Sequence, residues 1–169
     1  MNSYTPHQSK YFAEQILLQR PQSSIDGLVS AMSGVKVDLN PHQVDAALFA
    51  VKSPLSTGAL LADEVGLGKT IEAGLVLAQC WAERRRHILL IVPAALRMQW
   101  RSELFEKFYI DSLLMESAVY NKLRKEGVTN PFDVRARVVV WAYHFGSKNA
   151  LPLGHVTWGG VSIDEAHRV

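Results

Sequence analysis

The chain has 169 residues, which is long enough for one domain with a buried core. Hydrophobic residues make up 48% of it and charged residues 20%, a balance that is ordinary for a soluble globular protein and excludes a chain disordered by composition. The formal net charge of +2 is too small to indicate by itself a nucleic-acid partner.

Cys80 is the single cysteine, which excludes an intramolecular disulfide and a cysteine-based zinc site. The first residues, MNSYTPHQSK, lack the basic-then-apolar pattern of a secretion signal, and no apolar run approaches membrane-spanning length. We therefore expect a soluble cytoplasmic protein with no membrane partner.

Residues 1–37 are expected to form a helical lead-in segment that packs on the main domain, residues 38–169. Two short helices are predicted within the lead-in, Tyr11–Arg20 and Ser24–Met32, with Pro21 and nearby polar residues between them.

Helices and short apolar runs alternate from Asn40 onward. Asn40 is a candidate N-cap, Pro41 suits the first helical turn, and Val44–Val51 supplies an apolar face. The later expected elements are an apolar run at Gly58–Ala62, a helix at Lys69–Ala82, a strand at His87–Val92, a helix at Ala94–Phe108, a strand at Leu113–Val119, a polar connection at Lys122–Phe132, and strands at Arg137–Tyr143 and Val161–Ile163. This alternation indicates an α/β fold with a mostly parallel sheet and helices on both faces.

The segment A-D-E-V-G-L-G-K-T follows an apolar run and opens a helix, which is the context of a phosphate-binding loop. Gly66 and Gly68 can adopt positive φ and let backbone amides approach phosphate oxygens. Lys69 would reach the β- and γ-phosphates, and the Thr70 hydroxyl would bind magnesium. The general pattern has glycine where this chain has Asp63. The alternative interpretation is an ordinary strand–turn–helix connection with a lysine in its first turn.

Near the end of the chain, V-S-I-D-E-A-H places two acids directly after an apolar run. Asp164, at the end of a strand, can hold magnesium through a water, and Glu165 can orient or deprotonate the attacking water. Alternatively, Asp164 caps a following helix and Glu165 is solvated. Beside the upstream loop, the first interpretation is favoured, because the two motifs supply complementary parts of one site for ATP and Mg²⁺.

Together the motifs resemble those of superfamily 2 helicases, and within them the Swi/Snf-like ATPases of bacterial type. D-E-V-G-L-G-K-T-I-E-A-G is similar to the family's first motif, in which an aspartate at the position of Asp63 is usual. I-D-E-A-H resembles its second motif, whose final residue, His167, is implied to couple the ATP state to a partner domain. L-N-P-H-Q resembles the upstream glutamine motif, in which Gln43 would read the adenine edge.

The resemblance implies a RecA-like domain with specific site residues. The catalytic set is Lys69, Asp164, Glu165 and His167, and the magnesium ligands are Thr70 and Asp164. The nucleotide contacts are Gln43, Asp63, Glu64, Val65, Gly66, Leu67, Gly68, Lys69 and Thr70.

The segment I-V-P-A-A-L-R-M-Q-W resembles motif Ia, which implies contacts with a nucleic-acid backbone. Arg97 and Gln99, near a helix N-terminus, can contact phosphates without reading sequence. Trp100 is either a base-stacking platform or a buried aromatic at helical spacing with Leu96 and Leu104.

The chain ends two residues after D-E-A-H, whereas the family continues with a third motif and a second RecA-like domain that supplies an arginine finger. The resemblance therefore implies an incomplete RecA-like domain that lacks a central strand and leaves backbone groups unpaired. We expect an isolated chain of these residues to be marginally stable, to bind nucleotide weakly and to hydrolyse negligible ATP.

The leading hypothesis is the ATP-binding part of a DNA-dependent ATPase that moves on nucleic acid, with duplex DNA as the partner of the parent protein. Two alternatives stay open. D-E-A-H also occurs in RNA helicases, and the chain could be a non-catalytic remnant that at most binds a nucleotide or a partner.

Overall fold

The computed structural model describes residues 36, 39–52, 58–62, 68–134, 137–148 and 153–168. The two helices expected within residues 1–37 lie outside this part of the chain, as do residues 63–67 of the expected phosphate loop.

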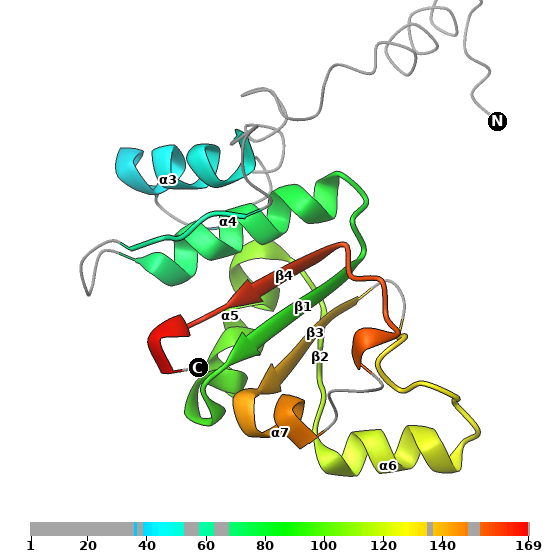
Figure 1. Ribbon diagram of the computed structural model, residues 1–169. Coiled ribbons are helices and arrows are strands. Elements are labelled where there is room, and N and C mark those ends of the chain that lie inside the picture. The colour runs from blue at the N-terminus through cyan, green and yellow to red at the C-terminus, as the bar shows by residue number, and fades with distance from the viewer. Residues whose placement is uncertain are drawn as a thin grey trace, which may run out of the picture.

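Four parallel strands form the sheet at the centre of the fold, in the order β2-β3-β1-β4 (Figure 1). Leu89 of the central strand β1 lies opposite Val139 of β3 on one side and Val161 of β4 on the other. The strands are β1 (His87–Val92), β2 (Ser112–Leu114), β3 (Arg137–Ala142) and β4 (Gly160–Ile163).

Helices cover both faces of this sheet, so the α/β fold with a parallel sheet is confirmed. Figure 1 shows α3 lying across α4, away from α6 and α7. The helices are α3 (Pro41–Lys52), α4 (Lys69–Ala82), α5 (Arg97–Phe108), α6 (Ser117–Lys125) and α7 (Tyr143–Lys148), with 3-10 turns at Ala94–Leu96 and Ala166–Arg168.

The two faces have different cores. On the side of α3, α4 and α5, which we call the motif face, the core is mainly aliphatic and includes Leu75, Ile88 and Val138. On the side of α6 and α7, which we call the aromatic face, it centres on Phe132 and Trp141. Alternate residues of β1 and β3 point to opposite faces, as the pleat of a strand requires.

Helices α4 and α5 approach each other closely at Gly74. A Cβ atom added there would lie 2.3 Å from two atoms of the Phe108 ring, which is too close for any side chain. Glycine at this position therefore sets how deeply α5 packs against the helix that follows the phosphate loop.

Two of the expected elements are wrong. The strand expected at Leu113–Val119 ends at Leu114, and α6 occupies the first residues of the expected polar connection at Lys122–Phe132. Val119, Tyr120 and Leu123 explain the difference, because they recur at helical spacing and pack against the aromatic core.

The apolar run Gly58–Ala62 does not form a strand, and the Leu60 side chain is 78% exposed. A short apolar run becomes a strand only where a neighbouring strand pairs with it, and in the described residues β4 pairs with β1 alone. Val161 and Ile163 of β4 are exposed as well. Within the described part of the chain, no helix is long and apolar enough to cross a membrane.

Candidate nucleotide site

The phosphate-loop residues that the structure describes form the start of α4. Gly68 precedes the helix in the left-handed conformation, with φ 93°, and its carbonyl accepts hydrogen bonds from the amides of Ile71 and Glu72 at 2.7 and 3.2 Å. Lys69 and Thr70 are the first two helical residues. The positive end of the helix dipole therefore coincides with a lysine and a hydroxyl, the groups that a phosphate-binding turn needs.

Gln43 packs against this turn. Its side chain is only 5% exposed, and a Cβ atom on Gly68 would lie 2.3 Å from its amide nitrogen. The amide oxygen accepts a hydrogen bond of 3.2 Å from the backbone N–H of Asn40, the N-cap residue of α3. This is one half of a capping box, so Gln43 joins the start of α3 to the phosphate turn.

Asp164 lies in the turn after β4. Its backbone N–H donates to the carbonyl of Ile91 at 2.9 Å, which continues the sheet by one residue. The Trp100 indole N–H donates to its carboxylate Oδ2 at 2.8 Å, and the Tyr143 hydroxyl donates to its carbonyl oxygen. The half-buried carboxylate is therefore held by a tryptophan from α5, a contact that the sequence did not reveal.

Glu165 and His167 follow in the same turn. Glu165 has φ 53°, a left-handed conformation that is uncommon for a residue with a side chain. The His167 Nε2 lies 3.4 Å from its carboxylate, and the histidine is largely exposed. An uncommon backbone conformation next to Asp164 is consistent with a functional turn.

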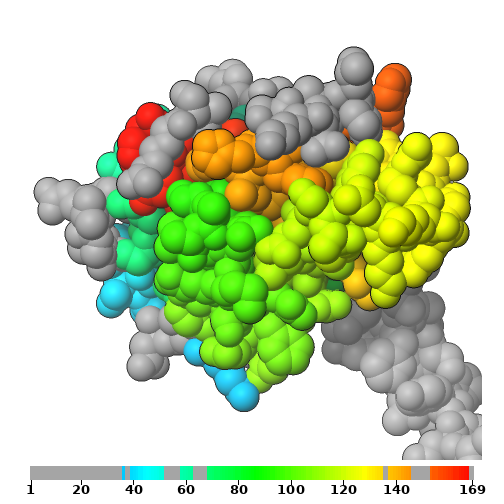
Figure 2. All heavy atoms as spheres, turned by 90° about the horizontal axis from the view of Figure 1, so that it is seen from below, coloured from blue at the N-terminus to red at the C-terminus, as the bar shows by residue number. Residues whose placement is uncertain are grey.

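Figure 1 shows the first turn of α4 and the turn after β4 at the same edge of the sheet, where the strands end. Figure 2, seen from below, shows the red residues after β4 beside the orange α7, which agrees with the contact between Tyr143 and Asp164. Ligands of α/β sheets bind at this edge.

Magnesium at this edge would have few protein ligands and would take the others from waters and, when a nucleotide is bound, from its phosphates. No group of three or more histidine, cysteine, aspartate or glutamate side chains within the described ranges is placed to hold a metal. Among the described residues, the motifs bring the Thr70 hydroxyl and the Asp164 carboxylate to this edge, with the Glu165 carboxylate beside the latter. Mg²⁺ characteristically takes one or two such protein ligands beside phosphate oxygens and waters, so these residues fit it.

Glu72 was not among the residues that the sequence singled out. Its side chain is fully buried in the first turn of α4, in the T-I-E-A-G part of the first motif. A carboxylate between apolar neighbours, one turn after the phosphate lysine, was the available signal, since charged residues are seldom fully buried.

The expected nucleic-acid residues lie on α5. The Arg97 guanidinium pairs with Glu116 at 2.6 Å and also donates to the carbonyl of Ala94 at 3.0 Å. The Gln99 amide donates to Glu103 at 2.8 Å. Both side chains lie near the surface and already have protein partners.

Trp100 is only 3% exposed, so it offers no surface on which a base could stack. Base stacking by Trp100 is thus wrong, and its other interpretation, a buried aromatic that packs in the core with Leu104, is confirmed. Helical spacing explains why Trp100 is buried, because positions 100, 104 and 108 lie on the same face of α5 and are all buried.

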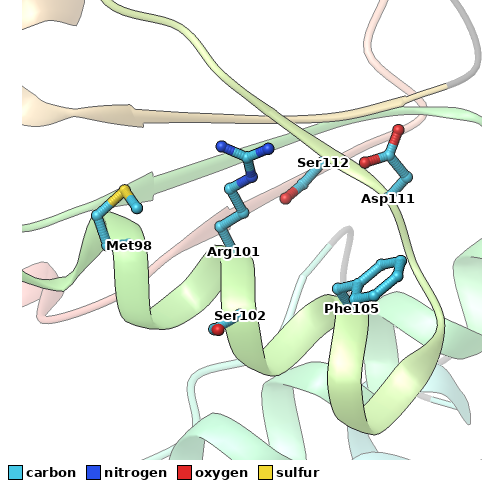
Figure 3. Close-up of a pocket in the computed structure, with 6 residues that line it drawn as sticks. All are labelled: Met98, Arg101, Ser102, Phe105, Asp111 and Ser112. Carbon is cyan, nitrogen blue, oxygen red and sulfur yellow. The ribbon is translucent and has the colours of Figure 1, made fainter.

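A shallow pocket of about 300 Å³ lies between the outer side of α5 and the start of β2, and none of the proposed nucleotide-site residues lines it. Figure 3 shows the Arg101 side chain extending from α5 toward the stretch that carries Asp111 and Ser112. Arg101 is exposed, and no ion pair engages it among the residues described. It is a further basic group on α5 beside Arg97, and the sequence motifs did not single it out.

Comparison with known proteins agrees with this geometry. The model of the SNF2-related domain family matches residues 18–169. The RNA polymerase-associated proteins RapA of Yersinia pestis and Yersinia pseudotuberculosis are 34% identical over 144 residues, which cover 83% of this chain. The chain spans about 15% of the length of these relatives.

Among solved structures, the SWI2/SNF2 ATPase core of Sulfolobus solfataricus, in complex with dsDNA, is similar with a TM-score of 0.66 at 22% identity. The similarity covers 80% of this chain and 28% of that chain. The fold is thus of the RecA-like class found in helicase-type ATPase cores. The chain belongs to the SNF2-related domain family, which confirms the resemblance to Swi/Snf-like superfamily 2 helicases.

Proposed function

We propose that this chain is the ATP-binding part of a DNA-dependent translocase of the SNF2 family, and that residues 38–169 form one nucleotide-binding domain. The observation that carries the proposal is the arrangement at one sheet edge. The left-handed Gly68 turn at the start of α4 and the anchored Asp164 after β4 lie where the strands end.

In this proposal, each group at the sheet edge has one task. Lys69 and the first amides of α4 bind the phosphates, because their positive charge and N–H groups complement the phosphate oxygens. Thr70 and Asp164 hold magnesium, which would neutralise charge on the phosphoryl oxygens. Glu165 orients the attacking water, and Gln43 presents its amide to the adenine. His167 transmits the nucleotide state to a partner domain.

Residues 63–67, which carry Asp63, Glu64, Val65, Gly66 and Leu67, lie outside the described residues, and their contacts with the nucleotide belong to the same proposal.

The nucleic-acid partner in this proposal is duplex DNA. The structural relative was solved with dsDNA, and the relatives named RapA are RNA polymerase-associated proteins. On this chain, Arg97, Gln99 and Arg101 lie on α5 at or near the surface and would contact backbone phosphates. Such contacts position the protein without reading sequence, as a protein that moves along DNA requires.

The test is MgATP binding by the whole chain and by K69M. Loss of a charge-assisted contact with phosphate should weaken binding about tenfold or more. Because Lys69 lies at a helix start and is only partly buried, and methionine keeps the length of the side chain, the melting temperature should stay within about 2 °C of the parent chain. The measurements are isothermal titration calorimetry and thermal unfolding.

K122M is the matched control. Lys122 lies on α6, its side chain is 75% exposed, and the same charge is removed there. MgATP affinity should be unchanged in K122M. Equal affinities for K69M and the parent chain would contradict the proposed phosphate site.

A further inference from the structure

Two segments that are 64 residues apart in sequence meet at one hydrogen bond beneath the sheet edge. Trp100 lies in the first turn of α5, four residues before the buried Leu104, and its indole Nε1 donates to the Asp164 Oδ2 at 2.8 Å. The bond thus joins the helix proposed to face nucleic acid to the carboxylate proposed to hold magnesium.

The register of β4 explains why these groups can meet. Ser162 lies opposite Leu90 of β1, whose side chain belongs to the motif-face core, and Asp164 follows two residues later on the same face. Helix α5 packs against that face through Trp100, Leu104 and Phe108. The carboxylate therefore turns toward α5 and away from the aromatic face.

The backbone and the side chain of Asp164 are held by different elements. Its N–H is bound to Ile91 of β1 and its carbonyl to Tyr143 of α7, so the path of the turn is fixed without α5. In the described part of the chain, Trp100 is the sole hydrogen-bond donor to the carboxylate. Helix α5 thus controls the orientation of the Asp164 side chain but not the path of its backbone.

The chemistry of the indole makes this contact directional. An indole has one N–H donor and no acceptor, so it fixes a single carboxylate oxygen. With Oδ2 bound to Trp100, Oδ1 is left for a water or a metal ion. A hydrogen bond to a metal-binding carboxylate orients the ligand and tunes how strongly it binds.

We propose that Trp100 is a positioning residue, which orients the Asp164 carboxylate for magnesium and couples that site to the first turn of α5. The inference rests on the proposed function, because it assigns a role around the same magnesium site. Any movement of the start of α5 on binding nucleic acid changes the donor to Asp164. By the reciprocity of coupled equilibria, magnesium in turn biases the position of α5.

The experiment compares W100F with W81F in the full chain. Phenylalanine keeps an aromatic ring at position 100 but removes the N–H. Trp81 is the control, because its ring stacks with the Arg86 guanidinium at 4.4 Å on the far end of α4, away from Asp164. ATP affinity is measured with millimolar Mg²⁺ and with EDTA, and the ratio of the two affinities is the readout.

In W100F this ratio should fall about tenfold, as is typical when a group that orients a metal ligand is removed. The affinity in EDTA should stay near that of the parent chain, and W81F should leave both values unchanged. A purely structural role of Trp100 would lower both affinities together. An unchanged ratio in W100F would overturn the inference.

A second measurement does not depend on the folding of W100F or on ATP. The indole N–H signal of Trp100 in a ¹⁵N NMR spectrum should shift in D164N, and Mg²⁺ alone should shift it in the parent chain but not in D164N. If the parent chain binds no ATP, the proposed function fails, whereas the indole signal still decides this inference. An indole signal that does not change in D164N, or does not respond to Mg²⁺ in the parent chain, would overturn it.

Discussion

The two faces of the sheet differ in what they bury. The four buried polar side chains among the described residues all lie on the motif face: Gln43, Glu72 and Gln79 on its helices, and Ser112 on β2 opposite Val138. The aromatic face instead buries rings in contact with one another. The centroid of the Phe132 ring lies 5.3 Å from the ring centroids of both Tyr120 and Trp141.

This difference indicates that the aromatic face serves mainly the stability of the fold, whereas the motif face also serves binding. A buried polar group costs free energy unless it is hydrogen-bonded, so the burial of carboxylate, amide and hydroxyl side chains on one face only indicates that this face keeps these groups for another purpose. Substitutions on the aromatic face should therefore change the free energy of unfolding alone. Substitutions on the motif face should change binding as well.

The largest effect is expected from F132A. Phe132 is fully buried at the centre of the aromatic cluster, and removal of its ring should destabilise the fold by about 3–5 kcal/mol. The MgATP affinity of the molecules that remain folded should be unchanged. Urea denaturation and calorimetry measure the two quantities.

F105A is the control for F132A, because Phe105 lies exposed on α5 and its removal should cost no more than about 0.5 kcal/mol. A loss of MgATP affinity in folded F132A would contradict the separation of the two faces.

A smaller loss is expected from G74A on the motif face. The added methyl group would overlap the Phe108 ring and force α4 and α5 apart, at a cost of about 1–3 kcal/mol. Thermal unfolding measures the change. The double variant G74A/F108L should recover part of the loss, because the smaller side chain vacates the space. Equal melting temperatures for G74A and the parent chain would exclude the close approach of the two helices.

The smallest effect on stability is expected from E116Q. The Arg97–Glu116 pair is partly exposed, so its loss should cost less than about 1 kcal/mol. Removal of this acid frees the Arg97 guanidinium, and affinity for duplex DNA should rise about two- to threefold at low salt. Fluorescence anisotropy with a labelled duplex measures it.

E126Q on α6 serves as the control for E116Q, since it breaks the exposed Lys122–Glu126 pair at 3.9 Å without touching α5. A fall in DNA affinity in E116Q, or an equal rise in E126Q, would argue against α5 as the DNA-facing helix.

Elements whose causes are local were predictable from the sequence. The bounds of α4 and β1 agree with those expected, because apolar periodicity and the flanking Gly68 and Arg84–Arg86 are all contained in the segment. The conformation of the apolar run Gly58–Ala62 could not be predicted, because a strand depends on a neighbour that a local pattern cannot supply.

The candidate site likewise has features that the sequence predicts and features that depend on tertiary packing. Motif order predicted Lys69 and Asp164 as site residues, but it could not predict which side chain contacts which. The contacts of Gln43 with Gly68 and of Trp100 with Asp164 depend on how helices and strands pack over long sequence separations. Burial of Trp100 followed from helical spacing, whereas its bond to Asp164 required the register of β4.

The contact between Gln43 and Gly68 also restricts how related sequences can diverge. A side chain at position 68 would be strained by the left-handed backbone and would also displace the glutamine amide. Loss of the glutamine would open space but would also remove the cap on α3. We therefore expect the residues at positions 43 and 68 to change together, if at all, among relatives that keep the site.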